Sequence, residues 1–349
     1  MRYFLASCSA PPIPMPGGCS GNIVRMLPKS RIFSALLLGI GVALVVWGLV
    51  APRFVHADGR LPLDLEATTY VLHDSDAQTT INSDPLAGVV TTPVTRQLHF
   101  EVMDPASADE ATIRIGDSML RGNPDTQGFE QERLLSATVS SFRIDRTSGE
   151  VLSDIALTNQ LASPTVQYSV DGIWLKFPTD AQETTYNVVD PVLRSALPAD
   201  FVESTEIDGR EVLHYRQVVD NANVAEYFAD ANNTTTLTKE DGGTTTGYFY
   251  HNVTRDFWVD QRTGLVVDLA ENIDDFYGDR SGQKYEQKLL FDASLDDAAV
   301  SKLVAQAESI PDGDVSKIAN TVGIVIGAVL ALVGLAGCFG AFGKKRREA

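Results

Sequence analysis

A continuous apolar stretch near the C-terminal end constrains this chain more than any other feature. Residues 318–342 include no charged side chain, and Lys344, Lys345, Arg346 and Arg347 follow shortly after. About 20 apolar residues are enough for an α-helix to cross the hydrocarbon core of a bilayer. Backbone polar groups find no water there, so a single apolar segment crosses as a helix. The sequence therefore predicts a transmembrane helix whose basic end faces the cytoplasm.

A second apolar run, residues 32–50, follows the basic residues Arg25, Lys29 and Arg31. It has no charged side chain and predicts another transmembrane helix, with the preceding cations on the cytoplasmic side. Residues 55–57, Val-His-Ala, match a signal-peptidase site poorly. An uncleaved membrane anchor is therefore favoured over a cleaved signal peptide.

The flanking segments complete this topology. Residues 51–317 form the expected extracytoplasmic domain, tethered to one membrane at both ends, and residues 343–349 form a basic cytoplasmic tail. Residues 1–31 contain a Pro- and Gly-rich stretch, a composition that orders poorly. Residues 1–31 therefore have two interpretations: a disordered cytoplasmic tail, or an over-extended reading frame whose true start is Met26. Either way we expect a two-pass plasma-membrane protein with both termini in the cytoplasm.

Charge is distributed unevenly along the chain. Residues 52–317 contain 20 lysines and arginines against 45 aspartates and glutamates, a formal charge of −25, whereas the whole chain carries −18. Such an acidic domain repels nucleic acid and anionic headgroups. Solubility is the simplest reason for the charge, with binding of Ca²⁺ or a cationic partner as the alternative.

The cysteines indicate the compartment. All three, Cys8, Cys19 and Cys338, lie outside the central segment, so it forms no disulfide. A disulfide-free extracytoplasmic domain of this size can fold on its core alone, and is typical of a bacterial envelope rather than a eukaryotic secretory route.

The central segment consists of short β-branched and aromatic runs separated by Asp, Asn, Gly and Pro, the pattern of strands joined by turns. The runs that predict strands are residues 95–103, 111–119, 137–145, 166–177, 211–219, 244–260, 264–276 and 283–291. We therefore expect a mainly β domain with antiparallel meander connections. Helix is expected as a short turn at residues 190–197 and as a longer element at residues 294–309, where Ser294 and Asp297 have capping-box spacing.

One pattern, F-x-[IV]-D-x-x-[ST]-G-x-V, occurs twice, as FRIDRTSGEV and as FWVDQRTGLV. In each copy an apolar strand leads into a polar turn, where Asp145 or Asp260 can accept bonds from backbone amides. Gly149 and Gly264 can take the positive φ that closes a hairpin. We expect two related lobes, with convergence of two unrelated hairpins as the alternative.

Small residues recur at every fourth position in both apolar runs. They are Ala35, Gly39 and Ala43 in the first run, and Gly323, Gly327 and Ala331 in the second. This spacing lets the backbones of two membrane helices approach closely. It predicts that the two spans pack together, although Gly and Ala are also frequent in unpaired membrane helices.

No motif for catalysis or cofactor binding stands out. The histidines are His56, His73, His99, His214 and His251. No two of them have zinc-ligand spacing. The acidic cluster of Asp274, Asp275 and Asp279 lacks the alternating ligands and terminal Glu of an EF-hand, so we assign no metal site. Nucleophile elbows, phosphate loops and dinucleotide fingerprints are also missing from the sequence, and we expect a non-enzymatic protein without a cofactor.

Several segments taken together resemble a known family. They are GIWLKFPTDAQETTYNVVDP at residues 172–191, the I-D-G-x-E-V run that begins at Ile207, FWVDQRTGLVVD at residues 257–268, and the capped helix that leads into a basic-ended span. In this order, over about residues 27–347, the chain is similar to the DUF3068 family of actinobacterial membrane proteins, also labelled the porin PorA family. The resemblance implies a two-span protein with an extracytoplasmic β-rich domain and no assigned catalytic residue. A porin barrel crosses the membrane with many strands and does not use apolar helices, so the label fits this sequence poorly.

The paired hairpins also resemble, at the level of fold alone, periplasmic half-barrel domains that carry lipids. This favours a cell-envelope protein, anchored at both ends, whose extracytoplasmic domain binds a lipidic or amphipathic envelope component. The alternatives are a protein-interaction scaffold of an envelope complex, an envelope hydrolase without a recognisable motif, and the channel that the porin label suggests.

Overall fold

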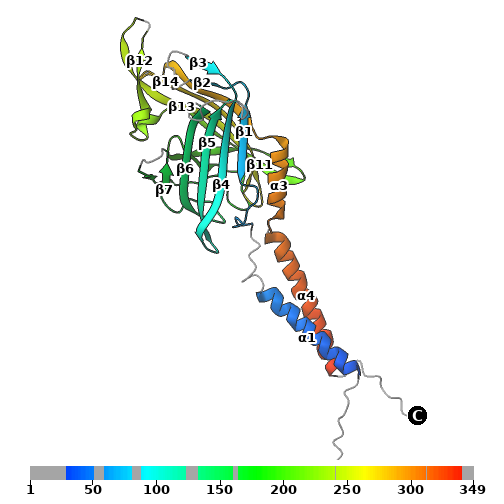
Figure 1. The fold of residues 1–349 in the computed structure, drawn as a ribbon. Helices are drawn as coiled ribbons and strands as arrows, with labels where there is room; N and C mark the ends of the chain where they lie inside the picture. Colours follow the sequence, from blue (N-terminus) through cyan, green and yellow to red (C-terminus); the bar gives the residue numbers. More distant parts are fainter. Residues whose placement is uncertain are drawn as a thin grey trace, which may run out of the picture. The chain divides into compact units, whose positions relative to one another are not determined.

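The structure, a computed structural model, describes residues 29–50, 59–80, 88–122, 133–159, 164–239, 241–311 and 313–339. Its contacts divide the chain into two compact units, Met1–Ala51 with Asn320–Ala349, and Pro52–Ala319. The first unit contains the apolar helices and the second contains the β domain (Figure 1). The expectations for the start at Met26, for the basic C-terminal tail and for residues 1–28 of the N-terminal tail lie outside the described residues. Residues 29–31, predicted as part of that tail, instead begin the first apolar helix.

Two apolar helices were predicted and both are present. Helix α1 is Lys29–Val50 and helix α4 is Gly313–Cys338. By length and composition each contains a stretch that could cross a membrane, Ile32–Val50 in α1 and Asn320–Cys338 in α4. Helix α4 begins before the predicted span, because hydropathy marks the part of a helix suited to lipid and not where the helix begins.

Glycines line the contact between α1 and α4. A Cβ atom on Gly41 would lie within 2.4 Å of the backbone nitrogen of Ala331, and one on Gly327 within 2.8 Å of the carbonyl oxygen of Gly41. Likewise a Cβ atom on Gly334 would lie 2.5 Å from the backbone nitrogen of Leu38. Only glycine leaves room at such points, so the two backbones approach closely. The late part of α4 meets the early part of α1, and the helices run antiparallel.

The predicted stripe of small residues coincides with this contact only in part. Gly327 and Ala331 lie in it, but Cβ atoms on Gly39 or Gly323 would meet nothing within 4 Å. The other predicted positions in α1, Ala35 and Ala43, are exposed. The residues of α1 that are buried are instead Ser34, Gly41 and Gly48, spaced by seven. A seven-residue repeat keeps one face of a helix against a partner at a shallow crossing angle, which explains why a four-residue pattern selected the wrong face of α1.

The β domain consists of two sheets, and its strand pairs are antiparallel. The six-stranded sheet has the order β1-β4-β5-β6-β7-β8. Its strands are β1 Thr69–Asp74, β4 Val94–Ala106, β5 Glu110–Arg121, β6 Leu134–Asp145, β7 Ile155–Thr158 and β8 Val166–Tyr168. From β4 onward this sheet is the predicted meander.

The nine-stranded sheet has the order β3-β2-β15-β14-β13-β11-β10-β9, and β12 pairs with β13. Its strands are β2 Gln78–Thr80, β3 Val89–Thr91, β9 Tyr186–Asp190, β10 Ser195–Ile207, β11 Arg210–Asn223, β12 Thr234–Thr238, β13 Thr244–Asp260, β14 Val266–Gly278 and β15 Lys284–Ser294. Two short 3-10 helices, Val224–Glu226 and Ala231–Asn233, connect β11 to β12. Strand β13 is long enough to pair with β12 at its start and with β11 further on.

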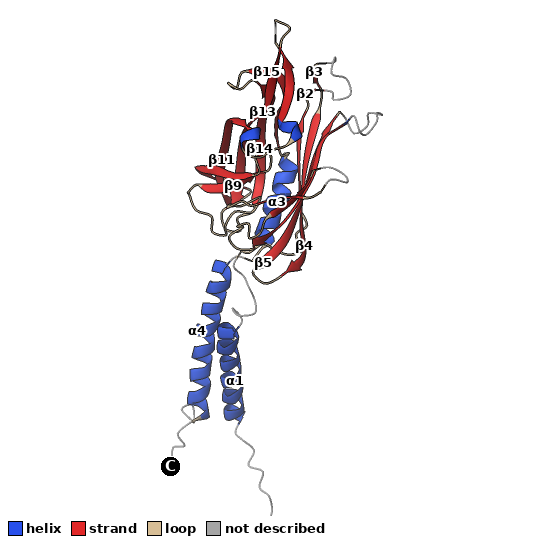
Figure 2. Cartoon of the chain, turned by 90° about the vertical axis from the view of Figure 1, so that its left-hand side faces the viewer, coloured by secondary structure: helices blue, strands red, loops and turns tan. Residues whose placement is uncertain are grey.

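The two sheets form separate layers with one helix, α3 (Asp297–Ser309), beside them (Figure 2). Residues that point inward from paired strands share one apolar core, as Ile113 with Phe142 in one sheet and Phe257 with Leu269 in the other. Helix α3 buries its apolar stripe, Val300, Leu303, Val304 and Ala307, and packs against β14. The prediction of a mainly β, antiparallel domain between two apolar helices is confirmed.

Three local predictions were wrong in part. Residues 190–197 form no helix: the Asp190 carboxylate accepts the Leu193 amide in a single turn, and Arg194, at a φ of 53°, redirects the chain into β10. The helix predicted from Ser294 begins at Asp297, because Ser294 still pairs with β14, and the cap is Asp296, which accepts the Ala299 amide at 2.7 Å. The strand predicted at residues 166–177 ends at Tyr168, and an irregular segment follows.

Candidate functional site

The two predicted Asp–Gly turns have the same geometry. In the first, Asp145 accepts the backbone amides of the next residues in the turn, and Gly149 has a φ of 76°. In the second, Asp260 accepts a turn amide at 2.8 Å, and Gly264 has a φ of 67°. The first turn follows β6 of the six-stranded sheet, and the second joins β13 to β14 of the other sheet. Each sheet therefore contributes one copy of the repeat.

Both turns contact one segment, residues 172–181, which we call the connector and which is buried from Ile173 to Phe177. A Cβ atom on Gly149 would lie 2.0 Å from the carbonyl oxygen of Lys176, and one on Gly264 would lie 2.0 Å from that of Phe177. Lys176 and Phe177 are fully buried. Glycine is required in both turns by the backbone conformation and by this close approach. The two turns of the repeat, one from each sheet, thus hold the connector in place between the sheets.

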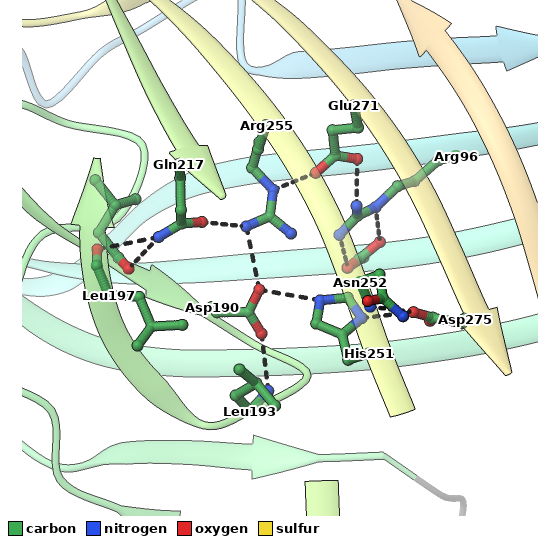
Figure 3. A network of polar contacts seen from close by, with 12 residues as sticks. Arg96, Asp190, Leu193, Leu197, Gln217, His251, Asn252, Arg255, Glu271 and Asp275 are labelled. Carbon is green, nitrogen blue, oxygen red and sulfur yellow. Dashed lines mark hydrogen bonds and ion pairs between the residues drawn. The ribbon is translucent and has the colours of Figure 1, made fainter. Parts of the chain in front are cut away.

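A series of buried charges joins the two sheets (Figure 3). Arg96 of β4 donates to Asp117 of β5 at 2.8 Å and also to Glu271 of β14. The other oxygen of Glu271 accepts from Arg255 of β13 at 2.5 Å. Because β4 and β14 belong to different sheets, Arg96 and Glu271 form a charged bridge between the layers.

The series continues within the nine-stranded sheet. Arg255 lies 3.2 Å from the Asp190 carboxylate and donates to the side-chain oxygen of Gln217 at 2.5 Å. Asp190 also lies 3.2 Å from His251, whose other ring nitrogen is 2.7 Å from Asp275. Asp190 is 0% and His251 1% exposed. Buried charges are tolerated when they are paired and hydrogen-bonded, and each of these has at least two partners. We call these residues, with Arg96, Asp117 and Glu271, the charge network.

The charge network fixes the protonation state of three of its members, His251, Asp190 and Glu271. Burial alone would lower the pKa of His251, but the carboxylates of Asp275 and Asp190 outweigh it and raise this pKa to about 10. Burial would raise the pKa values of Asp190 and Glu271, yet their cationic neighbours hold both below the ordinary value. These three groups are therefore charged at neutral pH, and none is poised to exchange a proton. The arrangement suits a structural role.

The acidic cluster noted in the sequence is dispersed into separate contacts. Asp274 pairs with Lys284 at 2.7 Å, Asp275 belongs to the charge network, and Asp279 accepts the Ser281 amide within a turn. Over the described ranges, no group of three or more His, Cys, Asp or Glu side chains could hold a metal ion. The structure therefore offers no donor set on which to place a metal or cofactor in these residues.

A groove of about 490 Å³ runs beside α3. One wall is an irregular segment, residues 61–67, which we call the strap, and the other is α3 with the two residues after it. Apolar lining comes from Pro62, Leu65, Ala67, Ala305, Ile310 and Pro311, and polar lining from Asp64, Glu66, Lys302, Gln306 and Ser309. The volume lies within the range of small-ligand sites.

The strap is held at both ends by hydrogen bonds. At its start, the Leu61 amide donates to the Arg146 carbonyl at 2.8 Å. At its end, the side-chain oxygen of Gln306 accepts the Glu66 and Ala67 amides at 3.0 and 2.5 Å, and its nitrogen donates to the Ala67 carbonyl at 2.9 Å. Gln306 thus binds the strap as a neighbouring strand would, and it fixes the width of the groove.

Neither the charge network nor the groove was predicted from the sequence. The network combines positions 96 to 275, and its only local signal is a charged residue at an inward position of an otherwise apolar strand, as Arg96 and Arg255 are. The groove joins residues about 240 positions apart, and the only sign of Gln306 is one amide at the edge of an apolar helical stripe.

Comparison with known proteins identifies the family. The family described as Porin PorA matches residues 33–336. Two relatives named Porin PorA, from Corynebacterium resistens and Corynebacterium amycolatum, are 23% and 24% identical to the chain over 221 and 234 residues. These alignments cover 54% and 56% of this chain and 52% and 59% of the relatives, so the chain spans a little over half the length of each.

The match to the family begins just inside α1 and ends near the close of α4, so it includes the described strands of both sheets, the connector, the charge network and the groove. The resemblance to the porin PorA family read from the sequence is confirmed. On this match, the chain belongs to the porin PorA family.

Proposed function

We propose that this envelope protein crosses the plasma membrane twice, exposes its β domain outside, and binds a lipidic or amphipathic envelope component in the groove beside α3. The groove carries the proposal, because a lining of both apolar and polar side chains suits a molecule that has both a hydrocarbon part and a polar head. Pro311, which lines the groove, precedes the start of the second candidate span at Asn320 by nine positions. No catalytic step forms part of the proposal.

The orientation rests on charge. Basic residues precede the first apolar run and follow the second, and such residues are enriched on the cytoplasmic side of membranes. A reporter fused after Arg347 should therefore be active only in the cytoplasm. Activity of an external reporter at this position would contradict the two-pass topology.

Photolabelling of the full-length chain tests the groove. The chain would be reconstituted into phosphatidylcholine vesicles that contain a lysophosphatidylcholine with a diazirine on its acyl chain. We expect cross-links to strap and α3 peptides, in addition to those on the apolar helices. Ala305→Trp, which fills the groove, should abolish the strap and α3 labels. Glu308→Trp, on an exposed position of α3 outside the groove lining, should retain them. Labels confined to α1 and α4 would refute ligand binding in the groove.

A channel is the second candidate, favoured by the name of the family. Against it, each sheet in the described part of the chain has two end strands, β1 and β8 in one and β3 and β9 in the other, so neither closes on itself as a porin barrel does. The purified chain should leave a planar bilayer without discrete conductance steps. Reproducible steps that vanish with a truncated chain would favour the channel over the lipid-binding protein.

A further inference from the structure

A small cavity of about 10 Å³ adjoins the groove within the β domain. Leu65, Ala67 and Gln306 line both spaces. The remaining lining of the cavity comes from the core and is mostly apolar: Thr68, Tyr70, Phe100, Leu175, Leu265, Val266 and Leu303. A space of this size holds about one water molecule at most. The strap and Gln306 therefore lie between an open groove and a small, mostly apolar cavity in the core.

The contacts that close the Gln306 end of the strap are neutral. Gln306 fastens the strap through three hydrogen bonds to the backbone of Glu66 and Ala67. Residues 61–67 have no regular secondary structure, and Leu63, on the arch of the strap, is 44% exposed. Moving the Glu66–Ala67 end of the strap away from Gln306 therefore breaks only neutral hydrogen bonds and no ion pair. The other end, where the Leu61 carbonyl accepts from the Arg146 guanidinium at 2.8 Å, stays in place.

We propose that the groove is the closed form of an acyl-chain site that continues under the strap. Release of the strap from Gln306 joins the groove to the cavity, and one acyl chain then reaches Tyr70 and Leu303. The apolar lining beyond the strap selects a hydrocarbon chain. The headgroup stays in the groove, whose charged lining is two carboxylates, Asp64 and Glu66, and one cation, Lys302, and it is neutral or zwitterionic rather than anionic. This inference rests on the proposed function and adds the depth and class of the ligand.

Two positional probes test the depth of the site. The full-length chain would be labelled in phosphatidylcholine vesicles with lysophosphatidylcholines that carry the diazirine either next to the carboxyl group or at the chain terminus. We expect the first probe to label strap and α3 peptides and the second to label Tyr70, Phe100 or Leu265 in the core. Gln306→Leu, which keeps the side-chain volume but not the bonds, should raise core labelling by roughly fivefold, the effect of about one net hydrogen bond on an opening equilibrium. Glu308→Gln is the matched control on α3 and should change nothing.

The outcomes separate this inference from the proposed function. If both probes label only the strap and α3, and Gln306→Leu leaves the pattern unchanged, the groove binds the amphiphile but the site does not extend under the strap. If neither probe labels the β domain, ligand binding in the groove itself is refuted. An anionic lysophosphatidylglycerol probe that labels the core as strongly as the zwitterionic one would overturn the assignment of the headgroup.

Discussion

Two regions of the β domain are closed by opposite chemistry. The charge network joins the sheets through buried ion pairs, whereas the strap closes the groove through neutral hydrogen bonds from Gln306. Removing one partner of a buried ion pair leaves an uncompensated charge and costs about 3–5 kcal/mol. A neutral hydrogen bond contributes about 0.5–1.5 kcal/mol net. The difference implies that the sheets stay fixed to one another while the strap can open for a ligand.

The largest effect is expected from Glu271→Leu, which leaves Arg96 and Arg255 buried without their shared carboxylate. Loss of about 3–5 kcal/mol should lower the midpoint of thermal unfolding by about 10 °C. The measurement is tryptophan fluorescence of the full-length chain in detergent during heating. Glu110→Leu is the matched control, because Glu110 pairs with Arg143 with both side chains more than two-fifths exposed. It should shift the midpoint only slightly. Equal shifts for the two variants would remove the contrast between fixed and movable regions.

Gly264→Ala should come next, because it strains the contact between the second turn and the connector. The alanine would need a φ near 67° and would bring its Cβ atom within 2.0 Å of the Phe177 carbonyl oxygen. We expect a loss of more than about 2 kcal/mol in unfolding free energy. Gly122→Ala is the control: its φ is 80°, but a Cβ atom there meets nothing within 4 Å, so only the smaller conformational cost of about 1 kcal/mol applies. If Gly122→Ala lowered the unfolding free energy as much as Gly264→Ala does, the close approach to the connector would make no contribution to stability.

The pH dependence of the charge network gives a more gradual effect. The pKa of His251 is raised from 6.5 to about 10 in the folded state, so the folded chain retains a proton that the unfolded chain releases between these values. Its contribution is complete below about pH 6.5 and is lost as the pH rises towards 10. The stability difference between the wild type and His251→Gln, measured by denaturant unfolding, should therefore shrink across this window. A difference that stays constant from pH 6.5 to 10 would show that His251 is not held in its charged form.

The smallest effect on global stability is expected from Gln306→Leu, since the bonds that it removes are neutral and only partly buried. We expect a loss of about 1–2 kcal/mol at most. Hydrogen exchange should show the difference locally: the Glu66 and Ala67 amides should exchange faster, while amides of β13 and β14 beside the network keep their protection. Faster exchange throughout both sheets would mean that the strap is part of the rigid frame and not a separate closure.

Local patterns in the sequence were sufficient for the main elements. Uninterrupted apolar runs predict α1 and most of α4, because lipid imposes helix on a lone segment. Alternation of apolar and polar residues predicts the long strands except β10, a strand of 13 residues that no predicted strand covers. The repeat predicts the two Asp–Gly turns, because its Asp and Gly lie only four residues apart. The shortest strands, such as β2, β3 and β7, were missed because three or four residues are too few to establish a period.

Features that depend on distant residues were not predictable in this way. Which face of α1 meets α4 depends on the partner helix, and the structure selects Gly41 and Gly48 over Gly39. The charge network needs Arg96 and Glu271 to meet across two sheets, and the groove needs Gln306 to reach a strap 239 positions earlier. No periodic pattern in the sequence encodes such pairings, because the partner of each side chain lies far away along the chain and is brought near only by the tertiary fold.

The most direct test of the account compares the lipids retained by the wild-type chain and two groove variants. Each full-length chain would be extracted from its own membrane in polymer-bounded discs, and bound lipids would be quantified by mass spectrometry against the total membrane extract. We predict one amphiphile enriched with the wild type, lost with Ala305→Trp and kept with Glu308→Trp. An identical lipid profile for all three chains would contradict the claim that the groove beside α3 binds an envelope component.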